Sequence, residues 1–337
     1  LGIITARSGV NMSGGQFLVG TGITMGVAGI ATFRAGRIDV GDSLSNTSIG
    51  EGAGDAFTTG SQNTGVGRNA LTANTTGANS TAIGYQALTS NTTGQRNTAI
   101  GKDALDTNTT GSNNIAVGHN ALTANTTGAT NTSVGKSSLA ANTTGSLNTA
   151  LGTYSLQANT TANSNTGLGY AALYSNTTGA NNVAVGKDSL YTNTTGYKNV
   201  AVGADALQAN TTGASNNAIG FDAMSATTTG NDNVAFGLEA LKNNVEGDSN
   251  TALGHKALQD NTADYNTAIG RFALGENTTG TRNVGVAPFA LDANTTGSYN
   301  VAIGYASLTA NTTASNNTAI GYYALAANTT AANNVAV

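Results

Sequence analysis

The sequence predicts an all-β solenoid, either a parallel β-roll or a flattened β-helix, and three observations carry this prediction. A seventeen-residue unit of the form NTAIGYQALTSNTTG plus two residues recurs from Asn46 onward in the 337-residue chain. That period is too short for helical-hairpin repeats and is typical of solenoids, whose coils need only their neighbours for stability. The composition agrees, since 45 Gly, 1 Pro and 5% aromatic residues favour tight turns over a core of large side chains.

The repeat divides the chain into two parts. Residues 1–45 lack the period and alternate short apolar and β-branched pieces with Gly and Ser, which predicts short strands separated by turns. Residues 46–337 form the repeat solenoid, in which 46–62 is a degenerate first coil that resembles a cap. One residue is missing before Asn266, and the chain ends within a further coil. We therefore expect this chain to be a segment of a longer protein.

Within each coil, counted from its opening Asn, position four is aliphatic and position nine is Leu. We expect two strands and two turns per coil, with these positions forming two apolar ladders in the core. The predicted core residues are Ile83, Leu88, Ile100, Leu105, Val117 and Leu122.

Positions three and five hold Ala and Gly, so one face of the predicted strand is smooth. A strand that is apolar on both faces needs a cover on each side. We therefore expect this strip to meet another copy of the chain in a homo-oligomer, with the tight inside of a monomeric coil as the alternative. The predicted strip includes Ala82, Gly84, Gly101 and Gly203.

Charge and hydropathy exclude several classes of partner. The formal net charge is −4 and there is no basic run, so no nucleic-acid partner is expected. No apolar run approaches eighteen residues, so neither membrane insertion nor a signal peptide is expected. Cys is absent, which removes disulfides from the argument.

No catalytic or cofactor-binding constellation is found, and no enzymatic activity is expected. The two histidines, His119 and His255, share position six with Lys, Tyr and Arg, which indicates a solvent-facing site. Asp and Glu stack at position seven in four consecutive coils, which neighbouring Lys residues can neutralise. A calcium site would use Glu246, Asp248 and Asp264, but these residues also fit simple irregularity of the turns around the deletion.

Exposed aromatic residues are the candidates for receptor contact, because the apolar face of a sugar stacks on an aromatic ring. The alternative is that the rings fill grooves between chains or cover the Leu ladder. The candidates are Tyr85, Tyr170, Phe221, Tyr305, Tyr322 and Tyr323.

The Asn-Thr-Thr turn is formally an acceptor for N-linked glycans. Its fixed place in every coil is better explained by an Asn in the left-handed conformation, with Asn and Thr side chains that hydrogen-bond from coil to coil.

The unit NTAIGxxAL resembles the head repeats of trimeric autotransporter adhesins, and the NTTG turns resemble repeats of tail-fibre proteins of tailed bacteriophages. The pieces GIITARSGV and GVAGIATF resemble shaft segments of marine-phage tail fibres. These resemblances imply a left-handed roll, a homotrimer, and adjoining fibre or chaperone segments as partners.

The expected function is therefore that of a structural and adhesive segment of a phage tail fibre, which spaces a receptor-binding tip and can itself contact host cell-surface polysaccharide. The expected localisation is the virion tail fibre, outside the cell. One alternative is a bacterial surface adhesin or extracellular filament protein with the same roll, located on the bacterial cell surface. A more remote alternative is an ice- or surface-binding solenoid, which the Thr ladders suggest.

Overall fold

The computed structural model describes residues 42–337 of the chain. The shaft-like segment predicted for residues 1–45 therefore lies almost wholly outside the described residues. Residues 42–337 form a β-solenoid with about seventeen residues per coil, and no helix occurs among them. The predicted fold class is confirmed.

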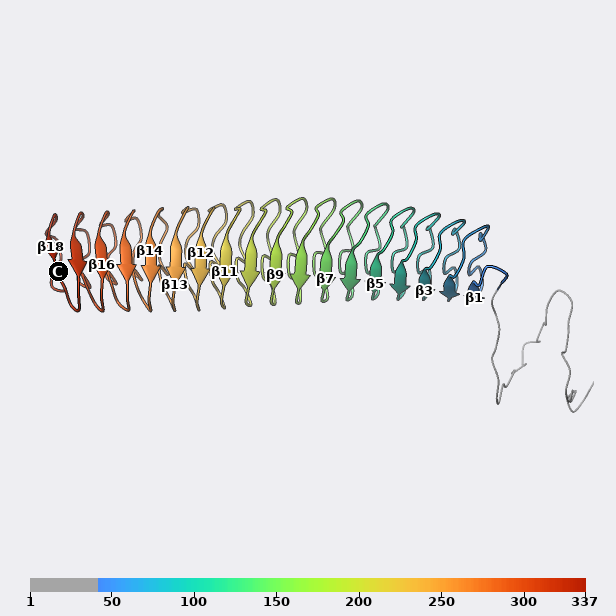
Figure 1. Cartoon of the computed structure of the whole chain (residues 1–337), viewed down its shortest axis with the longest axis horizontal. Helices are drawn as coiled ribbons and strands as arrows, with labels where there is room; N and C mark the ends of the chain where they lie inside the picture. Colours follow the sequence, from blue (N-terminus) through green and yellow to red (C-terminus); the bar gives the residue numbers. More distant parts are fainter. Residues whose placement is uncertain (1–41) are drawn as a thin grey trace, which may run out of the picture. The chain divides into compact units, whose positions relative to one another are not determined.

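Each coil contributes one short strand, and each strand pairs in parallel with the next strand along the chain (Figure 1). Thr81 of β3, for example, pairs with Thr98 of β4 one coil later. At the usual strand spacing of about 4.8 Å, the eighteen strands extend for about 80 Å. The strands are β1 Thr47–Ile49, β2 Thr64–Val66, β3 Thr81–Ile83, β4 Thr98–Ile100, β5 Ile115–Val117, β6 Thr132–Val134, β7 Thr149–Leu151, β8 Thr166–Leu168, β9 Val183–Val185, β10 Val200–Val202, β11 Asn217–Ile219, β12 Val234–Phe236, β13 Thr251–Leu253, β14 Thr267–Ile269, β15 Val284–Val286, β16 Val301–Ile303, β17 Thr318–Ile320 and β18 Val335–Ala336.

The second strand expected in each coil is absent from the described residues, and a series of turns takes its place. Positions seven and nine adopt positive φ, as in Gln86 (54°) and Leu88 (55°). This change of handedness breaks the alternation of an extended chain, so that Ala87 and Leu88 both point inward and are fully buried. Positive φ does not occur at the Asn of the Asn-Thr-Thr turn, contrary to our prediction.

The core is a column of Leu and Ala side chains. Leu88, Leu105 and Leu122 are fully buried, as predicted. Opposite them lies the Ala at position three of the strand, and Ala82 is also fully buried. A Cβ added at Gly65, the position-three residue of β2, would lie 3.7 Å from Cδ1 of Leu71. The space between strand and Leu ladder therefore fits Ala but no larger aliphatic side chain.

The predicted core positions at the fourth residue are wrong. Ile83 and Ile100 are 40% and 39% exposed, and Val117 is only partly buried. Because side chains alternate along a strand, burial of position three turns positions two and four outward. The predicted oligomer strip is wrong for the same reason, since Ala82 faces the interior of its own coil.

The glycines at position five also contact their own chain. Gly84, Gly101 and Gly203 have φ values of +136°, +134° and +134°, which side chains of L-residues rarely adopt. A Cβ at Gly84 would lie 2.5 Å from the carbonyl oxygen of Gly101 in the next coil. These glycines form the corner at which one coil stacks on the next.

Two ladders of buried Asn join neighbouring coils, as the sequence predicted for the turn. At position one, the backbone N–H of Asn63 donates to Oδ1 of Asn46 at 2.9 Å. At position twelve, Nδ2 of Asn91 donates to Oδ1 of Asn74 at 2.7 Å and to the Gly94 carbonyl at 2.9 Å. Because the position-twelve Asn is fully buried in coils such as these, it cannot carry a glycan in the folded rod.

The irregular coils keep the register of the sheet. In the sixteen-residue coil, Thr251 still pairs with Thr267, and Ala263 replaces the turn Gly as acceptor for Nδ2 of Asn250 at 2.8 Å. Pro288 stands at position six, and its carbonyl accepts the N–H of Ala306 at 3.0 Å. The deletion and the proline therefore leave the pairing of neighbouring strands intact.

Candidate functional site

The rod presents two long faces with different chemistry. We call the outward side chains of the strands, at positions two and four, the strand face; Thr81 and Ile83 are examples. The stretch that follows the strand runs back across the opposite side of the coil, and its outward side chains at positions six, seven and ten form the return face. Tyr85, Gln86 and Thr89 belong to it. The aromatic candidates for receptor contact lie on the return face.

The strand face has an apolar row along its length at position four, which is aliphatic except for Phe236, 52% exposed. Thr or Val dominates position two beside this row. Most of these Thr side chains are partly buried, as in Thr81 and Thr98, whereas Thr149 and Asn217 are exposed. Soluble monomers seldom present a continuous apolar strip of this length, which typically marks a contact surface.

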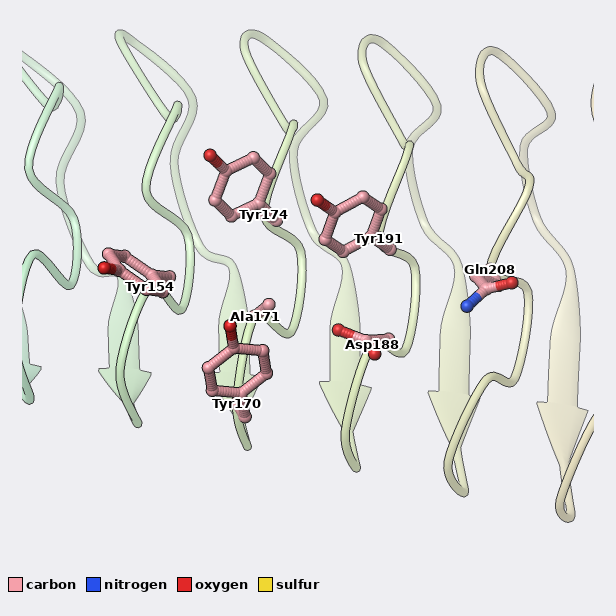
Figure 2. A pocket seen from close by; sticks show the side chains of 7 residues that line it. All are labelled: Tyr154, Tyr170, Ala171, Tyr174, Asp188, Tyr191 and Gln208. Carbon is pink, nitrogen blue, oxygen red and sulfur yellow. The ribbon is translucent and has the colours of Figure 1, made fainter.

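The return face differs from coil to coil, and it gathers four tyrosines on neighbouring coils between β7 and β9. Tyr154, Tyr170, Tyr174 and Tyr191 line an open trough of about 510 Å³, which we call the tyrosine trough (Figure 2). The rings of Tyr174 and Tyr191 are parallel, with centroids 5.0 Å apart. Tyr154 meets Tyr170 and Tyr174 edge-on at 6.0 and 6.4 Å.

Polar side chains close the end of the tyrosine trough toward β10. Asp188 and Gln208 line it together with the rings. The Asp188 carboxylate pairs with the ammonium group of Lys187, and that pairing raises the pKa of Lys187. Nε2 of Gln208 donates to Oδ1 of Asp205 at 2.8 Å, which fixes the amide at the edge of the trough.

A second aromatic row lies farther along the rod, on the coils of β13 to β17. The Phe272 and Phe289 rings stack with centroids 5.8 Å apart, and the Arg271 guanidinium lies over both of them. Tyr305 stacks on Tyr322 at 5.6 Å. Arg271 and the neighbouring rings cover the faces of Phe272 and Phe289, which we interpret as packing, whereas Tyr305 and Tyr322 are exposed by 40% and 75%.

The predicted receptor residues fall into three groups. Tyr170 lies in the tyrosine trough, while Tyr305, Tyr322 and Tyr323 belong to the second row. Tyr85 and Phe221 stand apart on the return face, exposed by 41% and 51%.

Sequence reasoning missed Tyr174 and Tyr191 because it considered only positions six and seven. The signal available was a Tyr at position ten in two consecutive coils.

The acidic residues are neutralised by their neighbours. Lys242 pairs with Asp222 at 2.9 Å and with Glu239 at 3.4 Å, and the hydrogen bond to Asp222 raises the pKa of Lys242. Burial opposes ionisation of Glu239, but the charges of Lys242 and Lys256 outweigh it and lower the pKa of this carboxyl group. The position-seven acids are thus relieved by Lys, as expected from the sequence.

The three residues considered for calcium do not converge. Oδ1 of Asp248 accepts the backbone N–H of Asn231 at 2.6 Å, and Oδ1 of Asp264 accepts the N–H of Asp248 at 2.8 Å. Glu246 is exposed to solvent. Within residues 42–337, no group of three or more His, Asp or Glu side chains is placed to hold a metal ion. These carboxylates instead serve as hydrogen-bond acceptors between coils.

Two carboxyl groups at position ten of the return face have perturbed ionisation. Burial raises the pKa of Asp106, and the nearby charge of Asp103 adds to the shift. Burial likewise raises the pKa of Asp292, with a further contribution from Glu276. Neither group has a nucleophile or base arranged around it, so both shifts are interpreted as consequences of packing.

No family model matches the sequence of this chain, and no curated protein matches it. Among residues 42–337, no helix is long and apolar enough to cross a membrane.

Proposed function

We propose that this chain is a structural and adhesive segment of a phage tail fibre, assembled as a homotrimer through its strand face. The observation that carries the proposal is the row of outward apolar side chains at position four, which continues from β1 to β17 and is flanked at position two mostly by Thr and Val. This row is roughly 80 Å long, which suits an extended contact along the rod. A second copy of the rod has the matching length and chemistry to cover it.

The internal ladders support a spacer role. Each coil is held to the next by the strand pairing, two Asn ladders and a Thr ladder, in which Oγ1 of Thr92 donates to the Thr109 carbonyl at 3.1 Å. Buried hydrogen-bonded amides make such a stack rigid, and the position-twelve ladder is interrupted where Thr227 replaces Asn between Asn210 and Asn244. Identical coils therefore give length and stiffness without a large core, as a fibre that holds a tip away from a particle requires.

The assembly is tested by two aspartates on the strand face. We expect the parent segment to have the mass of three 33.3 kDa chains, about 100 kDa, in mass photometry. Ile83→Asp with Ile100→Asp should give a folded monomer, since both side chains are exposed in the single chain. The matched control, Thr93→Asp with Thr110→Asp, places the same charges on exposed turn residues of the same coils and should stay trimeric.

Two results would contradict the assembly. If the parent segment is a monomer, the proposed homotrimer is wrong. If the aspartate variant stays trimeric, the interface does not lie on the strand face. The phage assignment is tested separately by immunogold labelling with antibodies against the segment. Labelled tail fibres on purified particles are expected, whereas label on the bacterial envelope alone would favour the surface-adhesin alternative.

A further inference from the structure

We infer that the tyrosine trough is a binding site for the pyranose rings of a neutral saccharide chain. This inference deepens the proposed function, because it assigns the contact with a host-surface glycan to one place on the rod. It depends on the return face alone, so it can fail while the strand-face trimer stands.

The arrangement of the rings is the first support. The strands lie behind the tyrosines in Figure 2, and the Tyr174 and Tyr191 rings are seen nearly face-on from the open side. Their planes differ by only 6°. Both rings are half-buried, so they are held in place while one face of each stays open. The apolar C–H face of a pyranose packs on such a surface, with a gain beyond the buried area alone.

The repeat distance is the second support. Tyr174 and Tyr191 occupy the same position of consecutive coils, so their centroids are 5.0 Å apart along the rod. This spacing is comparable to the length of one sugar unit in an extended polysaccharide. A chain that runs along the rod can therefore place successive rings over successive tyrosines, and the trough volume of about 510 Å³ is within the usual range for ligand sites.

The polar groups at the edge favour hydroxyls over charged ligands. Asp188 and Gln208 line the trough, and both can hydrogen-bond sugar hydroxyls. Lys187 neutralises Asp188, and Lys136 lies 5.6 Å from the Tyr154 ring centroid at the other end. Asp205, which holds the Gln208 amide, supplies a second carboxylate, so two carboxylates balance the two lysines. The trough thus has no excess of positive charge for a phosphorylated or sulfated chain, which argues for a neutral saccharide.

Contrast with the second aromatic row shows what distinguishes the tyrosine trough. In that row, Arg271 and the neighbouring rings cover the faces of Phe272 and Phe289, whereas the exposed Tyr305 and Tyr322 rings stack on each other and meet Tyr323 edge-on. In the tyrosine trough, four phenol groups surround an open volume beside a carboxylate and an amide. Aromatic residues alone do not define the site; the open ring faces and adjacent polar groups do.

Binding is tested by isothermal titration calorimetry and saturation-transfer NMR on the intact segment, with laminarihexaose, cellohexaose and maltohexaose as neutral probes. Hyaluronan hexasaccharide is the anionic comparison. We expect at least one neutral probe to bind more tightly than the anionic one. Tyr174→Ala with Tyr191→Ala should weaken that binding by roughly tenfold or more, because both stacking surfaces are lost.

A graded series separates stacking from general disruption. Tyr191→Phe keeps the ring and should retain most of the affinity, whereas Tyr191→Ala should not. The matched control is Tyr197→Ala in the same coil, whose ring is 50% exposed on a different edge and should leave binding unchanged. Mass photometry of each variant reports the assembly independently.

Two outcomes would overturn the inference. The first is a failed binding test. Either a correctly assembled segment binds none of the three neutral probes at millimolar concentration, or the double alanine variant binds as tightly as the parent segment. The second is a double alanine variant that loses its trimeric mass, which would make the trough an interface between copies. A parent segment that is monomeric yet still binds sugar would contradict only the proposed assembly.

Discussion

The strand face and the return face are built from the same coils, yet they differ in how strictly their residues repeat. Position four is a branched aliphatic residue in nearly every coil, whereas position six holds Tyr, Lys, His, Arg, Pro or Ala. Both faces are exposed in the single chain, so intrachain packing does not explain the difference. An exposed position that stays apolar over the length of a rod is compatible with the proposed contact between copies of the chain.

This contrast separates assembly from recognition. A uniform face suits contact with identical copies, since every coil then makes the same contact. A variable face allows one group of coils to differ from the rest, as the tyrosine trough does between β7 and β9. Because the coils are fixed by backbone and Asn ladders, substitutions on the return face leave the stack intact.

The largest effect is expected at the corner between the two faces. Gly203→Val should destabilise the segment by about 3 kcal/mol or more, because φ there is +134° and the new Cβ would lie 2.4 Å from the Gly220 carbonyl oxygen. Chemical unfolding followed by circular dichroism measures the loss. Gly275→Ala, at a glycine without positive φ, is the control and should be nearly neutral. A stable Gly203→Val chain that only fails to assemble would instead support the glycine interface predicted from the sequence.

The sequence was sufficient to predict the period, the Leu ladder and the hydrogen-bonded turn. Leu88 occupies position nine, which holds the same large apolar residue in nearly every coil. The Asn of the turn also recurs at a fixed place. The structure confirms both, with Leu88 fully buried and Asn91 bonded to Asn74. Strict repetition reveals these features because every coil makes the same contacts with the coil before it and the coil after it.

Which side of the strand faces inward could not be predicted from alternation alone. The pattern shows that Ala82 and Ile83 lie on opposite faces, but the larger residue was assigned to the core by general preference. The decisive fact is the width of the coil, since the Leu column leaves room only for Ala on the strand side. The tyrosine trough was missed for a related reason, because the positive-φ turns at positions seven and nine bring position ten onto the same face.

An effect of intermediate size is expected at position nine of the coil, and it distinguishes the two residues of that coil that the sequence assigned to the core. Leu105→Ala should cost about 2–5 kcal/mol, since the side chain is fully buried, whereas Ile100→Ala should cost less than about 1 kcal/mol in a dissociated chain. Native-state hydrogen exchange of the amides in residues 97–113, at a dilution that favours monomers, reports both values. Equal costs at the two positions would restore the prediction that both lie in the core.

The smallest effect concerns a carboxyl group of the return face. Burial and the charge of Glu276 raise the pKa of Asp292 above its ordinary value of 3.8, so ionisation of Asp292 at neutral pH destabilises the fold. Asp292→Asn should therefore stabilise the segment at pH 7, by less than about 1 kcal/mol because the site is only partly buried. The gain should be complete above the folded-state pKa and should disappear as the pH falls toward 3.8, where the parent carboxyl group is protonated in the fold.

Thermal unfolding of the parent and the variant across that pH range measures this gain. Glu276→Gln is the matched control, since it removes the neighbouring charge and should yield part of the same stabilisation at pH 7. The two substitutions should be less than additive because they relieve one shared repulsion. A gain from Asp292→Asn that does not change with pH would show that side-chain packing, and not ionisation, limits stability at this position of the return face.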